Sequence, residues 1–97
     1  MSIDNITYRL GGEVDLAAAP RLVEDLQGFA SRTTGTVVVD CAELSFLDSS
    51  GVDALLRVDR LLRSERRRLC LVHLQDTPRR VVEILGLRET LGVDESG

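Results

Sequence analysis

The chain has 97 residues, with 12 basic and 16 acidic side chains and a formal net charge of -4. This length favours one domain, and the acidic balance argues against nucleic acid as the main partner. All of the basic residues are arginines. The chain therefore has no lysine for a phosphate-binding loop, a Schiff base or a general base.

The beginning of the chain and its hydropathy predict a cytoplasmic protein. Residues 1–10 lack the basic stretch and apolar run that are typical of a signal peptide. No apolar run approaches the roughly 18 residues that a membrane-spanning helix needs. We therefore expect no membrane contact, and we expect Cys41 and Cys70 to be reduced in that compartment.

The first third of the chain predicts a strand, a turn and a helix. Residues 6–10 alternate apolar and polar side chains, which favours a strand. The two glycines at 11–12 indicate a turn, and residues 13–16 fit a short second strand or a loop. A helix is predicted from Pro20, which suits a first helical turn, to near Arg32.

Three further strands are expected along the rest of the chain. Residues 36–41 are rich in β-branched side chains and predict a strand that is buried on both faces. Residues 69–74 predict another strand, and a last short strand is expected within 87–93. Because helices are predicted between the strands, crossover connections and a largely parallel or mixed sheet are expected.

The two later helices are predicted by apolar spacing and by helix-start signals. Residues 52–64 repeat apolar side chains at helical spacing, with Asp59 inside the apolar stripe and Arg63 four residues later to pair with it. The last helix is expected to begin at residues 77–78, a capping threonine followed by a proline. Gly86 is expected to terminate it.

Residues 46–52 join an apolar run to a helix, and they carry one carboxylate and two hydroxyls. Any of Asp48, Ser49 and Ser50 could cap the helix by accepting a backbone N–H bond. A cap needs only one oxygen, so a hydroxyl remains that could be displayed for modification or recognition. A strand end beside a helix N-terminus favours an anionic group, which is compatible with a phosphoserine.

Other chemistries have weak support. A nucleophile elbow centred on Ser49 fails because Leu47 stands where a small residue is needed. His73 lies in a predicted strand, and its spacing from Cys70 sends the two side chains to opposite faces, which disfavours a metal site. Cys41 and Cys70 are expected to be small core residues, and a disulfide between them stays open.

Arginines gather at the C-terminal end of the second predicted helix, in residues 63–68. Cations there complement the helix dipole, so a solvated helix end is one interpretation. A secondary contact with an acidic partner is the other. A nucleic-acid patch is not expected in a chain of net negative charge.

Three motifs in order resemble the STAS family, and within it the bacterial anti-sigma factor antagonists. Residues 44–52 are similar to the family's phosphorylation-site signature. Residues 12–15 resemble its Gly-Glu-hydrophobic-Asp element, and residues 81–87 resemble a late helix that ends in Gly-Leu. The resemblance implies a single α/β domain over residues 1–97, with its C-terminal element short or truncated. It also implies a four- to five-stranded mixed sheet with helices mainly on one face.

The resemblance also implies a regulatory switch between proteins rather than an enzyme. The unphosphorylated form would bind an anti-sigma factor that is itself a serine kinase, and so free a sigma factor for stress-response transcription. The kinase would phosphorylate Ser49 and thereby switch binding off, using ATP and magnesium that belong to the kinase. A serine phosphatase would reset the switch.

The resemblance carries the partner-binding role to five positions: Asp15, Asp48, Ser49, Ser50 and Gly51. No catalytic, cofactor-binding or metal-binding residue is expected, and the oligomeric state stays open. The alternative is a non-catalytic STAS subunit of a stress-signalling assembly or of a lipid-transport ATPase complex. Nucleotide binding by the domain itself is a third possibility, disfavoured because the chain lacks a glycine-rich loop with lysine.

Overall fold

The computed structural model describes residues 7–94, which form an α/β domain. The strands are β1 (Thr7–Arg9), β2 (Gly12–Val14), β3 (Val37–Asp40), β4 (Leu44–Leu47), β5 (Leu69–Val72) and β6 (Val93–Asp94). The helices are α1 (Ala19–Ser31), α2 (Ser49–Ser64) and α3 (Asp76–Ile84). None of these helices has the length and apolar character that crossing a membrane requires.

The strands form a four-stranded sheet in the order β1-β3-β5-β6 and a two-stranded sheet of β2 and β4. The predicted α/β class is confirmed. All four strand pairs of the described residues are parallel, where the resemblance implies a mixed sheet. Parallel pairing follows from the chain order, because α1 connects β2 to β3, α2 connects β4 to β5, and α3 connects β5 to β6.

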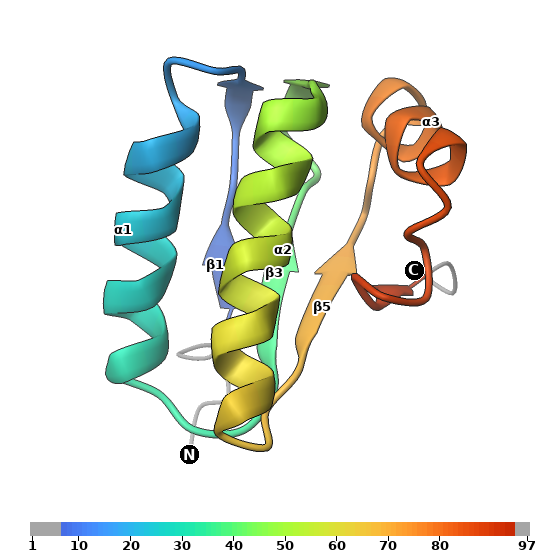
Figure 1. The fold of residues 1–97 in the computed structure, drawn as a ribbon. Coiled ribbons are helices and arrows are strands. Elements are labelled where there is room, and N and C mark those ends of the chain that lie inside the picture. The colour runs from blue at the N-terminus through green and yellow to red at the C-terminus, as the bar shows by residue number, and fades with distance from the viewer. Residues whose placement is uncertain (1–6, 95–97) are drawn as a thin grey trace.

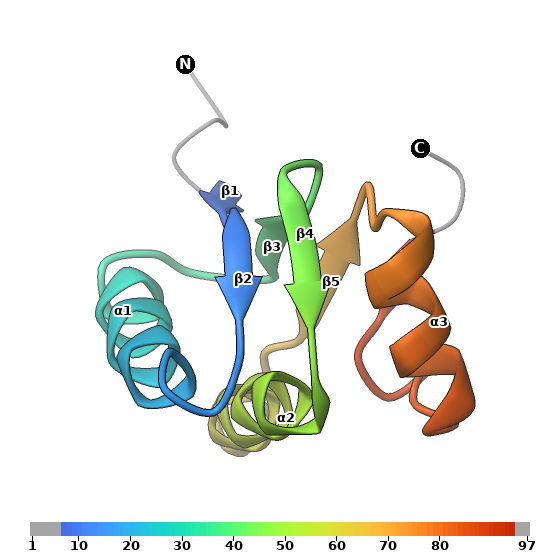
Figure 2. The same ribbon diagram turned by 90° about the horizontal axis from the view of Figure 1, so that it is seen from above.

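The chain passes from the four-stranded sheet to the two-stranded sheet where β1 leads into β2 and β3 leads into β4, and hydrogen bonds continue each strand pairing at these places. The amide of Leu10 donates to the carbonyl of Asp40 at 2.9 Å, and the amide of Gly12 donates to Glu43 at 2.9 Å. Figure 2 shows β2 and β4 side by side, in front of the four-stranded sheet. Sequence reasoning had not assigned β4, and this strand ends at Leu47, one residue before the capping position of α2.

The helices lie mainly on one face, as expected. Figure 1 shows α1 and α2 in front of the four-stranded sheet, and Figure 2 shows α3 to the side, near β4 and β5. Val39 of β3 and Leu71 of β5 are fully buried, as are Leu26 of α1 and Leu55 of α2. The core is therefore an aliphatic layer between the sheet and the two helices, as the scarcity of aromatic residues requires.

Two predicted boundaries differ from the structure. Strand β5 ends at Val72 rather than at residue 74, because His73 has a positive φ of 61° that breaks the extended conformation. Helix α3 begins at Asp76, and Gln75 occupies the capping position without a side-chain bond. The prediction that Thr77 caps this helix is therefore wrong, because Thr77 already lies inside its first turn.

The predicted pairing of Asp59 with Arg63 is confirmed. The Asp59 side chain is buried in α2, and its Oδ2 accepts a hydrogen bond from Arg63 Nε at 2.8 Å. Within residues 7–94 its Oδ1 has no hydrogen-bond partner. Arg63 also donates from Nη2 to the carbonyl of Thr90 at 3.1 Å, so this pair connects α2 to the segment that precedes β6.

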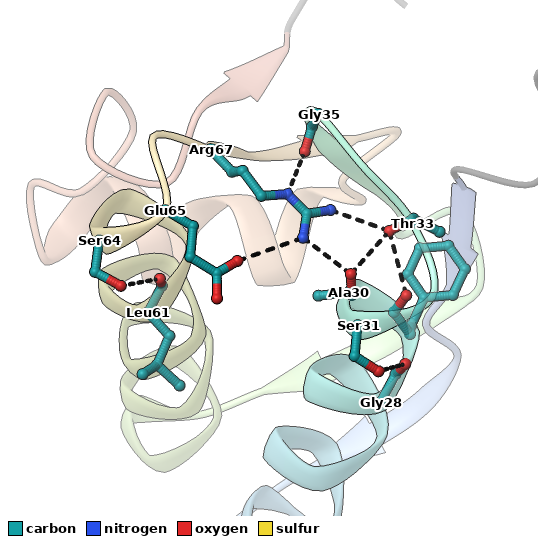
Figure 3. Close-up of polar contacts among 10 residues, drawn as sticks. Gly28, Ala30, Ser31, Thr33, Gly35, Leu61, Ser64, Glu65 and Arg67 are labelled. Carbon is teal, nitrogen blue, oxygen red and sulfur yellow. Dashed lines mark hydrogen bonds and ion pairs between the residues drawn. The ribbon is translucent and has the colours of Figure 1, made fainter.

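Arg67 joins the C-terminal ends of α1 and α2 (Figure 3). Its guanidinium donates to the carbonyl of Gly35 at 2.8 Å, to the carbonyl of Ala30 at 2.9 Å and to Thr33 Oγ1 at 3.0 Å. We call Arg67 with these three acceptors the Arg67 clasp. Its side chain is only 12% exposed, so the interpretation of residues 63–68 as a solvated helix end does not hold for Arg67.

The turn after α2 gives Arg67 its position. The amide of Arg67 bonds to the carbonyl of Leu62 at 2.8 Å, and the amide of Arg66 bonds to Arg63 at 3.0 Å. This is the Schellman pattern, which normally places glycine in the left-handed conformation. Here Arg66 adopts that conformation, with a φ of 61°. Such a conformation costs a non-glycine residue about 1 kcal/mol, and the Arg67 clasp offsets that cost.

Gly51 allows α2 to begin directly against β2 and β4. It is buried, and a Cβ at this position would lie 2.6 Å from Leu47 Cδ1 and 2.9 Å from both Val14 Cγ1 and the Val14 carbonyl oxygen. Separations below 3.0 Å require something to move, and the Val14 contact involves the backbone of a paired strand. Only glycine fits the first turn of α2 without displacing it.

We expect Gly51→Ala to lower the free energy of unfolding by about 2 kcal/mol, because the added methyl group overpacks this contact. Urea denaturation of the purified protein measures the change. Gly28→Ala in α1 is the matched control, since the nearest atom to its Cβ is Arg32 Nη1 at 3.5 Å. The control should gain about 0.5 kcal/mol from helix propensity. Equal effects of the two substitutions would contradict this account of Gly51.

Arg67→Ala should destabilise the protein by about 2–4 kcal/mol, because it removes three charge-assisted hydrogen bonds from a nearly buried group. Arg68→Ala is the control, since Arg68 is exposed at the adjacent position, and its effect should stay within about 0.5 kcal/mol. Thermal unfolding monitored by circular dichroism compares the two variants. A similar small shift for both would show that the Arg67 clasp contributes little.

Candidate functional site

The carboxylate of Asp48 caps α2. Its Oδ1 accepts a hydrogen bond from the amide of Gly51 at 3.0 Å, and its carbonyl accepts from the amide of Val52 at 3.0 Å. The backbone amide of Asp48 donates to the carbonyl of Val14 at 3.3 Å, which fastens the start of the helix to β2. Among the three candidate caps, the helix therefore uses the carboxylate, and neither serine is needed for this purpose.

The two serines occupy the first positions of a 16-residue helix, directly after the carboxyl end of β4. Ser49 is exposed and Ser50 is half-buried. The unpaired amides and the dipole of a helix start favour negative charge. The more accessible hydroxyl thus lies where a phosphate would be accommodated electrostatically.

Asp15 shapes the loop between β2 and α1. Its Oδ1 accepts from the amide of Ala18 at 3.0 Å, and its carbonyl accepts from the amides of Ala18 and Ala19 at 3.1 and 2.9 Å. These bonds fold residues 15–19 into a tight turn at the start of α1. Asp15 is half-buried, and the contact that the structure describes for its carboxylate is within its own loop.

A groove of about 530 Å³ lies beside the two serines, between the starts of α1 and α2. We call it the serine groove. Its lining residues are Leu16, Ala19, Pro20, Val23, Ser49, Ser50, Asp53, Ala54 and Arg57. The structure thus brings Ser49 and Ser50 together with residues of α1, whereas Asp15, Asp48 and Gly51 shape the surrounding backbone and do not line the groove.

Sequence reasoning missed the α1 wall of the serine groove and the charged pair opposite it. Leu16 is 74% exposed, and Asp53 and Arg57 form an i,i+4 ion pair of 3.6 Å on α2. The only sequence signal for Leu16 is its place before the helical repeat that starts at Pro20. Pattern analysis does not distinguish such a leucine from an ordinary surface residue.

A second polar cluster holds the connection between β3 and β4. Asp40 Oδ1 accepts from the amide of Ala42 at 3.0 Å and lies 3.1 Å from His73 Nδ1. Gln75 Nε2 donates to the carbonyl of Ala42 at 2.7 Å. The Ala42 amide, and then His73, hold the pKa of Asp40 below its ordinary value. His73 is thus engaged with Asp40 rather than with either serine.

The two cysteines lie on opposite faces of the sheet and are both free. Cys41 is fully buried, and burial raises the pKa of its thiol to about 12. Cys70 alternates with the buried Leu69 and Leu71, so it points to the opposite face, where partial burial raises the pKa of its thiol. The structure therefore gives no support to the disulfide that the sequence left open. Across residues 7–94, no three metal-ligating side chains are arranged to hold an ion.

Comparison with known proteins finds similar proteins over almost the whole chain. An anti-sigma-B factor antagonist of Listeria monocytogenes is 29% identical over 90 residues, which cover 93% of this chain and 79% of the relative. An anti-sigma-B factor antagonist of Staphylococcus epidermidis is 27% identical, with 98% of this chain and 94% of the relative covered.

Solved structures of a similar protein resemble this fold closely. The anti-sigma factor antagonist SpoIIAA in its unphosphorylated form has a TM-score of 0.75 and 27% identity, and the match covers 93% of this chain and 79% of that chain. The Bacillus cell fate determinant SpoIIAA in the phosphorylated form has a TM-score of 0.67 and 26% identity, covering 99% and 89%. The STAS domain model matches residues 2–96. The chain therefore belongs to the STAS family.

Proposed function

We propose that this protein is an anti-sigma factor antagonist whose unphosphorylated form binds a serine-kinase anti-sigma factor and so releases a sigma factor. The observation that carries the proposal is that Ser49 is an exposed residue at the start of α2, whose cap is already supplied by Asp48. The names of the relatives and the likeness to SpoIIAA in both phosphorylation states support it.

The covalent step takes place on Ser49 and uses chemistry that the kinase supplies. The Ser49 oxygen attacks the γ-phosphorus of the kinase-bound ATP, an O–P bond forms, the bond to ADP breaks, and the hydroxyl proton passes to a catalytic base of the kinase. Magnesium held by the kinase would supply positive charge against the phosphate oxygens of ATP. A phosphatase hydrolyses the phosphoserine and restores the hydroxyl. The role of this chain is to present the serine, so the protein is a regulator rather than an enzyme.

Phosphorylation changes the surface and leaves the fold in place. A phosphoserine adds about -1.5 to -2 charges at neutral pH, and the N-terminus of α2 accepts negative charge favourably. The Asp48 carboxylate stays hydrogen-bonded to the Gly51 amide, so its negative charge remains beside the new phosphate. If binding of the partner has to bury this charge, then desolvation of the phosphate and repulsion between like charges both lower the affinity.

The free energy required for such a switch is modest. A hundredfold loss of affinity corresponds to about 2.7 kcal/mol, and one poorly paired charge in an interface supplies that amount. No refolding of α2 is therefore needed. Ser50 is half-buried beside Ser49 and forms part of the same docking surface. Gly51 contributes by holding the start of α2 against β2, rather than by touching the partner. The components of this switch operate in the cytoplasm.

With the cognate anti-sigma factor kinase and labelled ATP, Ser49→Ala should abolish phosphate incorporation while the complex still forms, because only the acceptor oxygen is removed. Ser49→Asp should weaken binding, since it places a permanent charge on the docking face. Mass spectrometry locates the phosphate, and isothermal titration calorimetry measures the affinity.

Ser50→Ala is the matched control, and it should retain incorporation at position 49. Undiminished labelling of the Ser49→Ala variant at Ser50 would assign the switch to the other hydroxyl. Absence of transfer from every serine-kinase anti-sigma factor of the source organism, together with recovery of the chain in a multi-protein assembly, would favour the STAS subunit role instead.

A further inference from the structure

The serine groove is lined by aliphatic side chains and by the polar side chains of Ser49, Ser50, Asp53 and Arg57. Leu16, Pro20 and Val23 supply its apolar surface on one side, whereas Ala54 on α2 is only 3% exposed. Ser49 lies on the same wall as Ala54. A concave apolar surface of several hundred cubic ångströms can enclose one or two side chains of a partner.

Leu16 is held in its exposed position by the loop that carries it. The neighbouring Asp15 makes three hydrogen bonds to the amides of Ala18 and Ala19, so the backbone beside Leu16 is fixed before any partner arrives. A fixed backbone lowers the conformational entropy that is lost on binding. A leucine that is 74% exposed and mounted on such a loop is suited to act as a contact residue.

The charges on the groove wall do not call for a charged partner. Asp53 and Arg57 lie one turn apart on α2 and pair with each other at 3.6 Å, with both side chains about 60% exposed. Their mutual pairing leaves this wall close to neutral. We therefore expect the complementary surface to be apolar, because among the lining residues a charged side chain would meet only the Asp53–Arg57 pair, whose charges are opposite, and would lose hydration.

We propose that the serine groove receives an aliphatic or aromatic side chain of the anti-sigma factor kinase, with Leu16 as its main contact on this chain. This inference rests on the proposed function and deepens it, because it specifies the chemistry of the partner segment. The contact between this side chain and the groove then supplies binding energy. The same contact places Ser49, the phosphoryl acceptor, next to the kinase.

The same arrangement defines how phosphate opposes binding. A phosphoserine at position 49 would stand at the rim of the groove, and an apolar side chain entering there has to displace water from the dianion without offering a hydrogen bond in exchange. The loss of affinity is then a desolvation effect. Salt screens repulsion between exposed charges, but it does not restore the hydration of a buried phosphate.

Leu16→Ala should weaken binding of the unphosphorylated protein to its kinase by at least about tenfold, measured by calorimetry. Ile84→Ala is the matched control, because Ile84 is 75% exposed on α3, away from the groove lining, and its effect should stay within about twofold. Ala19→Leu, which fills the groove while keeping Leu16, should also weaken binding by at least about fivefold. Circular dichroism verifies that all three variants are folded.

Phosphoryl-transfer kinetics provide a second measurement. Leu16→Ala should raise the KM for this protein as kinase substrate and leave kcat within about twofold, because the contact is equally present before and during transfer.

The salt dependence of binding tests the desolvation mechanism. The ratio of the affinities of the unphosphorylated and phosphorylated forms should change by less than about threefold between about 0.05 M and about 0.5 M salt. A larger fall of this ratio would overturn the desolvation mechanism.

The outcomes separate this inference from the proposed function. If wild-type protein binds the kinase and is phosphorylated on Ser49, but Leu16→Ala binds with less than tenfold loss or no more weakly than Ile84→Ala, the groove is not the docking site. If wild-type protein neither binds nor accepts phosphate, the proposed function itself fails. A concentration-dependent dimer that Leu16→Ala dissociates would assign the groove to a second copy of this chain and overturn the proposal.

Discussion

The start of α2 depends on one close contact between a helix and a strand. The amide of Gly51 bonds to the Asp48 carboxylate, while the Cα of Gly51 lies so near Val14 that no side chain fits between them. This contact fixes the residue at which α2 begins and the rotation of α2 about its own axis relative to β2. Both serines, and with them one wall of the serine groove, have their positions because the helix starts there and nowhere else.

Much of the architecture was predictable because it follows from local patterns. The apolar spacing of the helices, the Pro20 start and the pairing of Asp59 with Arg63 depend on residues within one or two turns of each other. Strand β4 was not predictable in this way. It pairs with β2, from which α1 and β3 separate it in the chain. The burial of its side chains does not alternate regularly, because the pairing register shifts beside Gly12. That pairing is a tertiary contact with no local signature.

The candidate site was predictable only on its helix side. An acid followed by two hydroxyls, between a strand and a helix, indicates a cap and a spare oxygen, and the structure assigns the cap to Asp48. The opposite wall comes from Leu16 of the β2–α1 loop and from Ala19, Pro20 and Val23 of α1. The resemblance assigned Asp15 of this loop to the partner-facing surface, but no residue pattern in the sequence brings the α1 wall near Ser49. The turn at Arg66 was also hidden, because its left-handed conformation carries none of the usual glycine signal.

The Arg67 clasp is separate from the residues that would set selectivity among partners. It joins the two helices at the ends remote from the serines. These contacts lie outside the serine groove. Under the docking that we propose, an added methyl group or two at Ala19 changes which partner side chain fits the groove, while the clasp and the Ser49 hydroxyl stay as they are.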